Sequence, residues 1–292
     1  MTDLGEMGWI LGIRITRDRE KGTLALSQEK FIKEILERYG MSNSRPISTP
    51  ALPNEHLVKL TSPEVDAKSY QRALGSLMYP MLGTRPDLGY AIAALGRHAA
   101  NPGPDHQRAL ERMFHYLQAT SDHQLVLGRG SSGDSTLLGY ADADWASDVN
   151  DRKSTSGYVF KLGSGAISWS SKKQAAVALS STEAEYIAGA HAAKEAVWLR
   201  QLLSELGQDM SSPTVLRVDN QSAIAIAWNP EFHDRMKHIN VRYHFLRQVV
   251  DDGTVELTYT PTGEQVADTL TKGLPPALHN KFKSLMGVRH LD

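Results

Sequence analysis

The sequence contains no cysteine, which excludes a disulfide scaffold, a thiolate zinc site and a cysteine nucleophile. It has no apolar run near the roughly 20 residues that a membrane-spanning helix needs. Its N-terminal stretch lacks a basic segment followed by an apolar core, as a signal peptide would have. We therefore expect an intracellular protein with no membrane partner. Neither charge sign dominates, because 32 Lys and Arg stand against 33 Asp and Glu, so nucleic-acid binding must rest on a local site.

Length and composition are typical of a folded chain of about two domains. The chain has 292 residues, of which 41% are hydrophobic and 22% are charged, as in soluble globular proteins. The stretch 128–133 is rich in glycine and serine and is the best candidate for a boundary. We therefore predict one domain over residues 1–130 and a second over residues 131–292.

The first half predicts a small hairpin followed by helices. Apolar residues within 10–15 and 24–26 indicate two strands, which the dipeptide Lys21-Gly22 joins by a turn. Ser27 is placed to cap the helix that follows. Beyond a proline-rich stretch, the apolar spacing predicts three helices, over about 67–82, 87–99 and 104–119.

The second half predicts an α/β fold with one five-stranded mixed sheet and flanking helices. The expected strands are 137–141, 158–162, 166–170, 214–219 and 254–260, and the second and third form a hairpin. The expected helices are 181–206, about 221–228, about 239–251 and 264–272.

Acidic residues stand at the ends of these predicted elements, where mixed α/β sheets place their chemistry. A single aspartate there usually makes a turn or caps a helix, and an aspartate inside a helix is usually solvated. Several carboxylates at one sheet edge would repel one another unless a divalent cation lay between them. The acidic residues in question are Asp142, Asp144, Glu183, Glu185, Asp219 and Asp268.

The two glutamates at the start of the long helix have different expected roles. The face of Glu185 continues through small and apolar residues to Leu203, so it should face the sheet. Ser180 and Glu183 have capping-box spacing, which ties Glu183 to the helix start. A buried carboxylate needs a partner charge or a metal. Oxygen ligands favour Mg²⁺, with Mn²⁺ as a substitute, and two such ions can act on one phosphodiester.

Seven short sequence motifs, called words below, occur in the same order as in a known family. They are Gly139–Ala146, Arg152–Tyr158, Ile167–Gln174, Leu179–Tyr186, Val218–Ala223, Lys237–Phe245 and Ala267–Lys272. With these words, residues 139–272 resemble the ribonuclease H domain of copia-type retrotransposon polyproteins. The resemblance implies a ribonuclease H-like sheet and hydrolysis of the RNA strand of an RNA–DNA hybrid with two Mg²⁺ ions.

The first half resembles the segment after the polymerase palm in the same family, namely thumb and connection. The matching words include Leu11–Ile13, Gly75–Tyr79 and Thr84–Asp87. The Tyr-x-Asp-Asp word of the polymerase site occurs nowhere in the sequence. We therefore expect a polyprotein fragment or truncated element that has no polymerase activity and whose partner is the polymerase portion of a reverse transcriptase.

The family uses four carboxylates at its ribonuclease H site. Carried over by motif, the resemblance implies catalytic and metal-binding roles for Asp142, Glu185, Asp219 and Asp268. Asp142 and Asp144 are two residues apart on one predicted strand, so both side chains should point to the same face of the sheet. The position within the motif favours Asp142. The resemblance and the residues together therefore predict a metal-dependent endonuclease.

One departure from the broader ribonuclease H superfamily concerns a histidine before the last helix that helps product release. Residues 260–264 contain no histidine, and Thr262 and Gln265 have capping-box spacing instead. His238 and His244 are the remaining candidates for that role, and the alternative is that both are structural or solvated.

Residues near the expected hairpin and after the fourth strand are candidates for hybrid binding. They are Arg152, Lys153, Lys172, Lys173, Asn220 and Ser222. The alternative for the four basic residues is ordinary surface charge, and Asn220 is equally suited to cap a helix. We expect Trp145 and Trp169 in the core rather than stacked on bases.

Two other functions stay open. The chain could be a non-catalytic hybrid-binding or connection module, or a degenerate transposon remnant, with its carboxylates retained. A DNA-directed nuclease or integrase of the same superfamily is a third alternative. Integrases usually use three carboxylates, and the order of the seven words argues against this interpretation.

Overall fold

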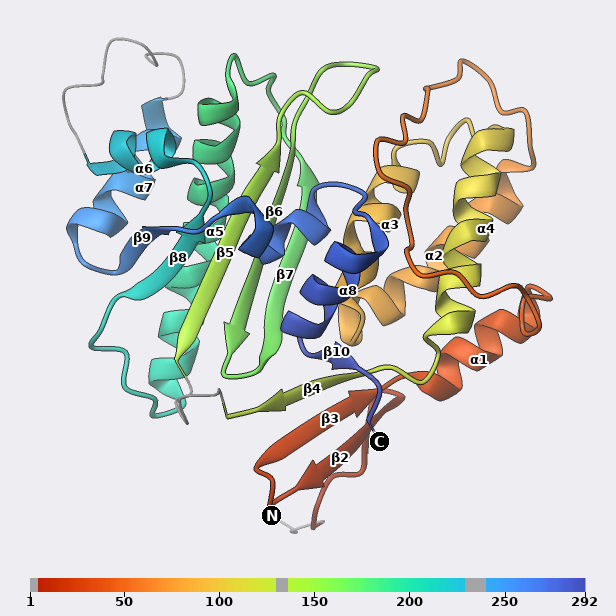
Figure 1. Ribbon diagram of the computed structural model, residues 1–292, viewed down its shortest axis with the longest axis horizontal. Helices are drawn as coiled ribbons and strands as arrows, with labels where there is room; N and C mark the ends of the chain where they lie inside the picture. The colour runs from red at the N-terminus through yellow and green to blue at the C-terminus, as the bar shows by residue number, and fades with distance from the viewer. Residues whose placement is uncertain (1–4, 130–135, 229–239, 292) are drawn as a thin grey trace. The chain divides into compact units, whose positions relative to one another are not determined.

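The computed structural model describes residues 5–129, 136–228 and 240–291, and the side chains of 240–243 are not described. The chain forms two compact units (Figure 1). Unit 1 contains Met1–Asp134, Gly163–Ala166 and Lys272–Asp292, and unit 2 contains Ser135–Leu162 and Ile167–Thr271. The segment from Lys272 onward therefore groups with the first half of the chain. The domain boundary predicted between residues 130 and 131 stays a prediction.

Unit 1 combines an antiparallel sheet with helices. Its sheet has the order β1-β2-β3-β4-β10. The strands are β1 (Trp9–Ile10), β2 (Ile13–Asp18), β3 (Thr23–Ser27), β4 (Gln124–Gly128) and β10 (Val288–Arg289). The helices are α1 (Glu29–Arg38), α2 (Ala67–Gly83), η1 (Pro86–Leu88), α3 (Gly89–Gly96), α4 (Pro104–Ala119) and α8 (Pro276–Leu285), where η marks a 3₁₀ helix.

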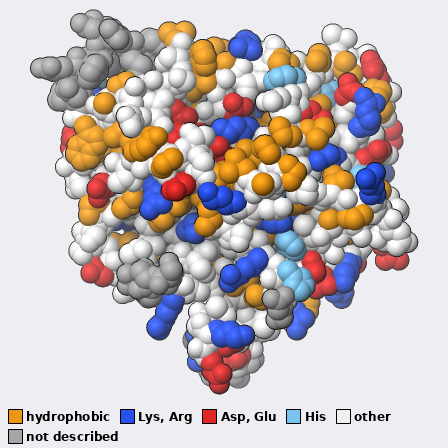
Figure 2. Space-filling model, in the orientation of Figure 1, with side chains coloured by type: hydrophobic (Ala, Val, Ile, Leu, Met, Phe, Trp, Pro, Cys, Tyr) orange, Lys and Arg blue, Asp and Glu red, His pale blue; other side chains and the backbone are white. Residues whose placement is uncertain are grey.

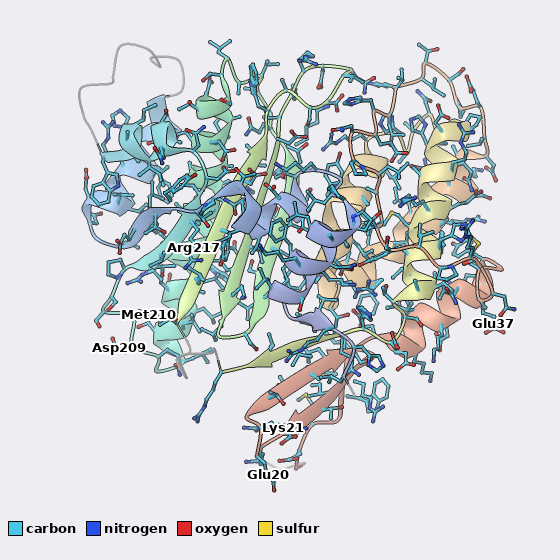
Figure 3. The ribbon with its side chains drawn as sticks, in the orientation of Figure 1. Glu20, Lys21, Glu37, Asp209, Met210 and Arg217 are labelled. Atoms are coloured by element: carbon cyan, nitrogen blue, oxygen red, sulfur yellow. The ribbon has the colours of Figure 1, made fainter. Side chains whose placement is uncertain are left out.

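The local sequence explains the first elements of unit 1. Gly22 has a φ of +62°, which glycine adopts readily, and it closes the β2–β3 hairpin with Lys21 at its tip (Figure 3). In α1 the apolar stripe Ile32, Ile35 and Leu36 is buried. The predicted hairpin and the helix over 67–82 therefore exist, whereas β4, β10 and α8 are additions that the apolar pattern did not predict.

Unit 2 contains a five-stranded mixed sheet in the order β7-β6-β5-β8-β9. Strand β5 pairs antiparallel with β6 and parallel with β8, and β8 pairs parallel with β9. The strands are β5 (Leu137–Asp144), β6 (Thr155–Leu162), β7 (Gly165–Lys173), β8 (Thr214–Val218) and β9 (Val255–Tyr259). The helices are α5 (Ser181–Glu205), α6 (Gln221–Trp228), α7 (Asn240–Asp251), η4 (Thr262–Glu264) and η5 (Val266–Leu270).

The long helix α5 packs on the sheet through small residues. Ala192 and Ala196 are fully buried, and they join the apolar residues of β5 and β8 in one core cluster. Gly207, with a φ of +82°, follows the helix end as predicted. The prediction of an α/β fold with one five-stranded mixed sheet and flanking helices is confirmed.

The predicted helix over 264–272 is wrong. The chain there forms two 3₁₀ helices, η4 and η5, with Gln265 between them in an extended conformation (φ −75°, ψ 93°). The Gln265 side chain donates to the carbonyl of Ala141 at 2.9 Å and accepts from the Ala267 N–H at 3.3 Å. This anchoring to β5 interrupts helical hydrogen bonding, and apolar spacing does not reveal it.

The surface is of mixed character, as the balanced composition predicts. On the face drawn in Figure 2, basic and acidic side chains are interspersed. Within the described residues, no helix is both long enough and apolar enough to cross a membrane.

Candidate active site

Two aspartates lie level with each other on neighbouring parallel strands. Tyr140 pairs with Arg217 in the β5–β8 register, so Asp142, two residues on, faces Asp219 just beyond the end of β8. Arg217 is labelled on β8 in Figure 3. Asp142 is buried and Asp219 is partly exposed. Because paired residues of parallel strands point to the same face, both carboxylates project on one side of the sheet.

The third carboxylate comes from the first turns of α5. Ser180 caps the helix, since its Oγ accepts from the N–H of Glu183 at 3.1 Å. The Glu183 carboxylate turns back and accepts from the N–H of Leu179 at 2.8 Å. Glu185 instead accepts from the N–H of Ala143 in β5 at 3.2 Å. The structure therefore uses Glu183 at the helix start and Glu185 on the sheet side.

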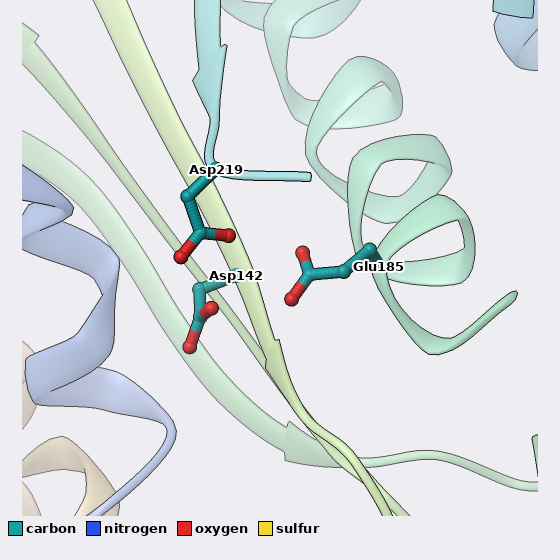
Figure 4. Close-up of side chains that lie close together, drawn as sticks. All are labelled: Asp142, Glu185 and Asp219. Atoms are coloured by element: carbon teal, nitrogen blue, oxygen red, sulfur yellow. The ribbon is translucent and has the colours of Figure 1, made fainter. Parts of the chain in front are cut away.

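Asp142, Glu185 and Asp219 form a carboxylate cluster (Figure 4). One oxygen from each lies within 4.8 Å of the other two. Figure 4 shows the three side chains pointing toward one another, two from the sheet and one from the helix. Asp144, which has the same strand parity as Asp142, is not a member of this cluster.

Electrostatic repulsion is concentrated on Glu185. Burial, with the nearby charges of Asp142 and Asp219, raises the pKa of the Glu185 carboxyl well above its usual range. Its Oε2 is buried and has no hydrogen-bond partner within the described residues. Three oxygen donors at this spacing, one of them buried and unsatisfied, fit a divalent cation such as Mg²⁺ or Mn²⁺.

Two hydroxyl groups orient the aspartates. Thr271, which follows η5, donates its hydroxyl to Asp142 Oδ2. Thr262 in η4 donates to Asp219 Oδ2 at 2.9 Å. Neither role was predicted, because Thr262 has capping-box spacing in the sequence and Thr271 has no marked partner there. No local spacing signals either bond, because the partners are 43 and 129 residues apart.

Asp268 is not brought into the cluster of three. It lies on η5 and is almost fully buried. The carbonyl of Asp268 accepts from the N–H of Thr271 at 3.2 Å, so its backbone supports the residue that contacts Asp142. The role of Asp268 as a fourth metal ligand stays a prediction.

A close approach of η5 to β6 fixes this arrangement. Gly157 pairs with Asp142 in the β5–β6 register. A Cβ atom at Gly157 would lie 2.8 Å from Cγ2 of Thr271 and 2.9 Å from Cβ of Leu270. Only glycine at this position lets Thr271 come within reach of Asp142.

The candidates for hybrid binding divide into exposed and engaged residues. Arg152, Lys172 and Ser222 are exposed, and Lys153 is partly exposed. Lys173 forms ion pairs with Asp148 at 2.5 Å and Asp151 at 2.8 Å. The carboxamide of Asn220 accepts from the N–H of Ala223 at 2.9 Å, so Asn220 caps α6.

Part of this basic group lines a pocket in unit 2. The pocket has a volume of about 250 Å³ and is bounded by the end of β7 and one face of α5. Its polar lining residues are Ser156, Lys172, Lys173, Gln174, His191 and Lys194. His191 and Lys194 were not among the predicted candidates, although they follow Ile187 at helical spacing on that face.

The aromatic and histidine predictions have mixed outcomes. Trp145 is 48% exposed, so its predicted place in the core is wrong. Its indole N–H donates to the carbonyl of Ala178 at 3.1 Å, and this bond holds the ring at the surface. Trp169 is partly buried, and His244 is exposed on α7. His238 lies outside the described residues.

Comparison with known proteins gives relatives over almost the whole chain. The chain is 44% identical over 298 residues to "Retrovirus-related Pol polyprotein from transposon TNT 1-94" of Nicotiana tabacum, covering 99% of this chain and 22% of that protein. It is 40% identical over 291 residues to "Retrovirus-related Pol polyprotein from transposon RE1" of Arabidopsis thaliana, covering 98% and 19%. The chain thus spans about a fifth of the length of these relatives.

The comparisons with family models and with solved structures do not extend this result. No family model matches the chain. The solved N-terminal RNase H domain of rv2228c from Mycobacterium tuberculosis, fused to maltose binding protein, has 14% sequence identity and a TM-score of 0.35. The match covers 51% of this chain and 96% of that chain, and at this TM-score it supports no conclusion. On its sequence similarity to the polyproteins of two plants, the chain belongs to the family of retrovirus-related Pol polyproteins from transposons.

Proposed function

We propose that the chain is a metal-dependent endonuclease that hydrolyses the RNA strand of RNA–DNA hybrids, as part of a retrotransposon reverse transcriptase polyprotein. The meeting of Asp142, Glu185 and Asp219 at one edge of the sheet carries the proposal. Three carboxylates this close are costly without a cation, and here two are buried. We assign catalytic and metal-binding roles to these three residues, with Asp268 as the fourth.

The three carboxylates would hold Mg²⁺, or Mn²⁺ in its place. Such a cation, when bound, lowers the pKa of a water molecule and stabilises the charge on a leaving oxygen. The chain's own contribution is to fix the ligand oxygens. The Thr271 and Thr262 hydroxyls orient Asp142 and Asp219, and the Ala143 N–H orients Glu185.

Hybrid binding would use the basic side chains of unit 2. Arg152 and Lys172 are exposed and available to phosphates. The carboxylates of Asp148 and Asp151 already neutralise Lys173, so we expect Lys173 to contribute less than Arg152 and Lys172 to the free energy of hybrid binding. The RNA strand would be selected through A-form backbone geometry and the 2′-hydroxyl group. Association with a polymerase portion, an intracellular location and the absence of polymerase activity stay predictions for this chain.

A cleavage assay with a matched pair of variants tests the proposal. An end-labelled RNA–DNA hybrid is incubated with the chain in Mg²⁺, in Mn²⁺ and in EDTA. Asp142→Asn should lower the rate at least about a hundredfold, because a lost metal ligand costs several kcal/mol of transition-state stabilisation. Asp144→Asn, on the same strand face, should keep the rate within about threefold. Equal losses in both variants, or cleavage in EDTA, would contradict the proposal.

A non-catalytic hybrid-binding module is the second candidate function. The observation that favours it is the absence of Asp268 from the carboxylate cluster. Under this alternative the chain binds the hybrid, and Mg²⁺ produces no cleavage. Cleavage of duplex DNA in the same assay would instead support a DNA-directed nuclease.

A further inference from the structure

Unit 1 contains a large pocket whose lining shares no residue with the carboxylate cluster of unit 2. The pocket has a volume of about 800 Å³. Its walls are the loop 45–48, one face of α4 with the residues after it, and α8. All of these segments belong to unit 1.

The lining of this pocket is basic. Five of its side chains carry a cationic group or an imidazole, and none is Asp or Glu. They are Arg45, Arg112, His115, His123 and Lys283. This lining of one charge sign contrasts with the balanced charge of the whole chain, which is −1.

Lys283 is a buried cation without a bound counter-charge. Its residue is 7% exposed, and its Nζ lies 5.7 Å from the centre of the Tyr116 ring. Within the described part of the chain, neither a hydrogen bond nor an ion pair reaches this ammonium group. The acid that attracts it most strongly is Asp87, but that carboxylate already accepts from Arg85 and from the Tyr116 hydroxyl. Most of the side chain is buried while Nζ stays accessible at the pocket wall, so an anion in the pocket would supply the counter-charge.

Three polar atoms on other lining residues are buried and have no hydrogen-bond partner within the described residues. They are Nε of Arg112, Nδ1 of His115 and Nδ1 of His123. Arg112 makes one hydrogen bond, from Nη2 to the Thr49 hydroxyl at 2.7 Å. Glu55 acts on Arg112 electrostatically, but it does not line the pocket. These atoms are shielded from solvent and out of a ligand's reach, so Lys283 and the cationic lining are what indicate a missing partner.

The missing partner must be anionic and rich in oxygen. A guanidinium presents a planar fork of donors, an ammonium presents a point charge, and the two together suit a phosphate group. The volume is in the range of pockets for small organic ligands, which exceeds the size of a bare phosphate ion. We propose that this pocket binds the phosphate group of a nucleotide or of a nucleic-acid strand, with Lys283 and Arg112 as its main ligands. The proposal does not depend on the nuclease proposed for unit 2.

Phosphate titrations of the full-length chain, in EDTA to remove metal, test this proposal. Calorimetry and the thermal midpoint are followed with inorganic phosphate, with adenosine 5′-monophosphate and with a short oligonucleotide that has no terminal phosphates. We expect inorganic phosphate to bind with a Kd near or below about 10 mM and to raise the midpoint. If adenosine 5′-monophosphate binds and the oligonucleotide does not, the ligand is a terminal phosphate group. If the oligonucleotide also binds, the ligand is the phosphate backbone of a strand.

Two variants on α8 form the matched comparison. Lys283→Met should weaken phosphate binding about tenfold or more and abolish the phosphate-dependent rise of the midpoint. Without phosphate it should fold at least as stably as the parent chain, because it removes a buried charge. Lys281→Met, at an exposed position outside the pocket, should leave binding within about twofold. Arg112→Gln provides a second lining variant with the same expected loss.

Two results would overturn the proposal. One is the absence of any phosphate-dependent heat or midpoint shift at about 10 mM phosphate. The other is an equal loss of binding in Lys281→Met and Lys283→Met, since that would indicate general charge attraction rather than a defined pocket.

Discussion

At the scale of single residues, two glutamates in the first turns of α5 have different roles, one in stability and the other in the proposed catalysis. Glu183 bonds the chain before α5, and Glu185 joins the carboxylate cluster. Glu185→Gln should abolish hybrid cleavage and slightly raise the free energy of unfolding without metal, because it relieves repulsion with Asp142 and Asp219. Glu183→Ala should keep most activity and lose about 0.5–1 kcal/mol of stability as the helix start frays. Cleavage rates and urea unfolding of both variants check this, and the reverse pattern would reassign the catalytic glutamate.

The buried imidazole of His279 makes the stability of unit 1 depend on pH. Its Nε2 lies 3.0 Å from the Tyr116 hydroxyl, which donates its proton to Asp87, so Nε2 carries a proton. Burial lowers the pKa of His279 to about 4, with Lys283 and Arg85 acting in the same direction and Asp87 opposing. The unfolded chain therefore binds more protons between about pH 6.5 and about pH 4.

Acid should therefore destabilise unit 1 through His279. The contribution of this residue to stability is full above about pH 6.5 and falls as the pH drops toward 4, by up to about 3 kcal/mol. His279→Gln keeps a donor for Tyr116 and should show a shallower fall in urea unfolding over that range. His123, whose pKa burial also lowers to about 4, accounts for part of the remaining slope.

Residues that act through local pattern could be predicted, and residues that act through distant contacts could not. The apolar face of the long helix and the capping spacing of Ser180 distinguish Glu185 from Glu183 on the sequence alone. Thr271 and the buried Arg85–Asp87 ion pair, at 2.7 Å, depend on distant residues, since Thr271 contacts Asp142 and Arg85 also donates to Thr120. The word Thr84–Asp87 served only as a mark of resemblance, and its structural role is this buried network.

At the scale of elements, Gly157 sets how closely η5 approaches the sheet. An added methyl group at Gly157 would push Thr271 and Leu270 away, since both lie within 3.0 Å of the new Cβ position. Gly157→Ala should cost about 1–3 kcal/mol and lower both Mg²⁺ affinity and cleavage about 10–100-fold, because Thr271 no longer orients Asp142. Calorimetric titration with Mg²⁺ and the cleavage assay measure the two effects.

Gly189 provides the control for this substitution. It lies in α5 of the same unit, and a Cβ there would meet only Leu246 at an ordinary 3.5 Å. Gly189→Ala should be neutral or stabilise by up to about 1 kcal/mol, as alanine favours helix. If Gly157→Ala left Mg²⁺ affinity unchanged, η5 would have no positioning role.

Helices and strands were predicted correctly where the apolar periodicity is strong. The prediction failed where a side-chain hydrogen bond to another element interrupts the helix. The strands of unit 2 and the long helix were predicted because alternating and helical apolar patterns are distinct over their lengths. The segment 264–272 has a helical pattern, but Gln265 bonds β5 and divides it into two 3₁₀ turns. A propensity for helix was overridden by one tertiary hydrogen bond.

At the scale of the whole molecule, the two units should respond separately to metal. Mg²⁺ that binds only the folded carboxylate cluster stabilises unit 2 by about 2.7 kcal/mol at a hundred times its Kd. Hydrogen exchange should therefore slow in β5, β8 and α5 on adding Mg²⁺, while α4 and α8 keep their rates. Slowing of equal size in both units would show that they unfold together. Asp142→Asn should remove the effect.

The β5–β8 pairing has a genetic consequence. The two strands face each other at a constant offset, with Tyr140 against Arg217 and Asp142 level with Asp219. Backbone hydrogen bonds set this offset, and the length of the intervening chain does not. Insertions or deletions in the exposed loop between α5 and β8 should therefore be tolerated. A single-codon insertion within β5 or β8 would turn one aspartate to the opposite face of the sheet and separate the pair, even in a chain that still folds.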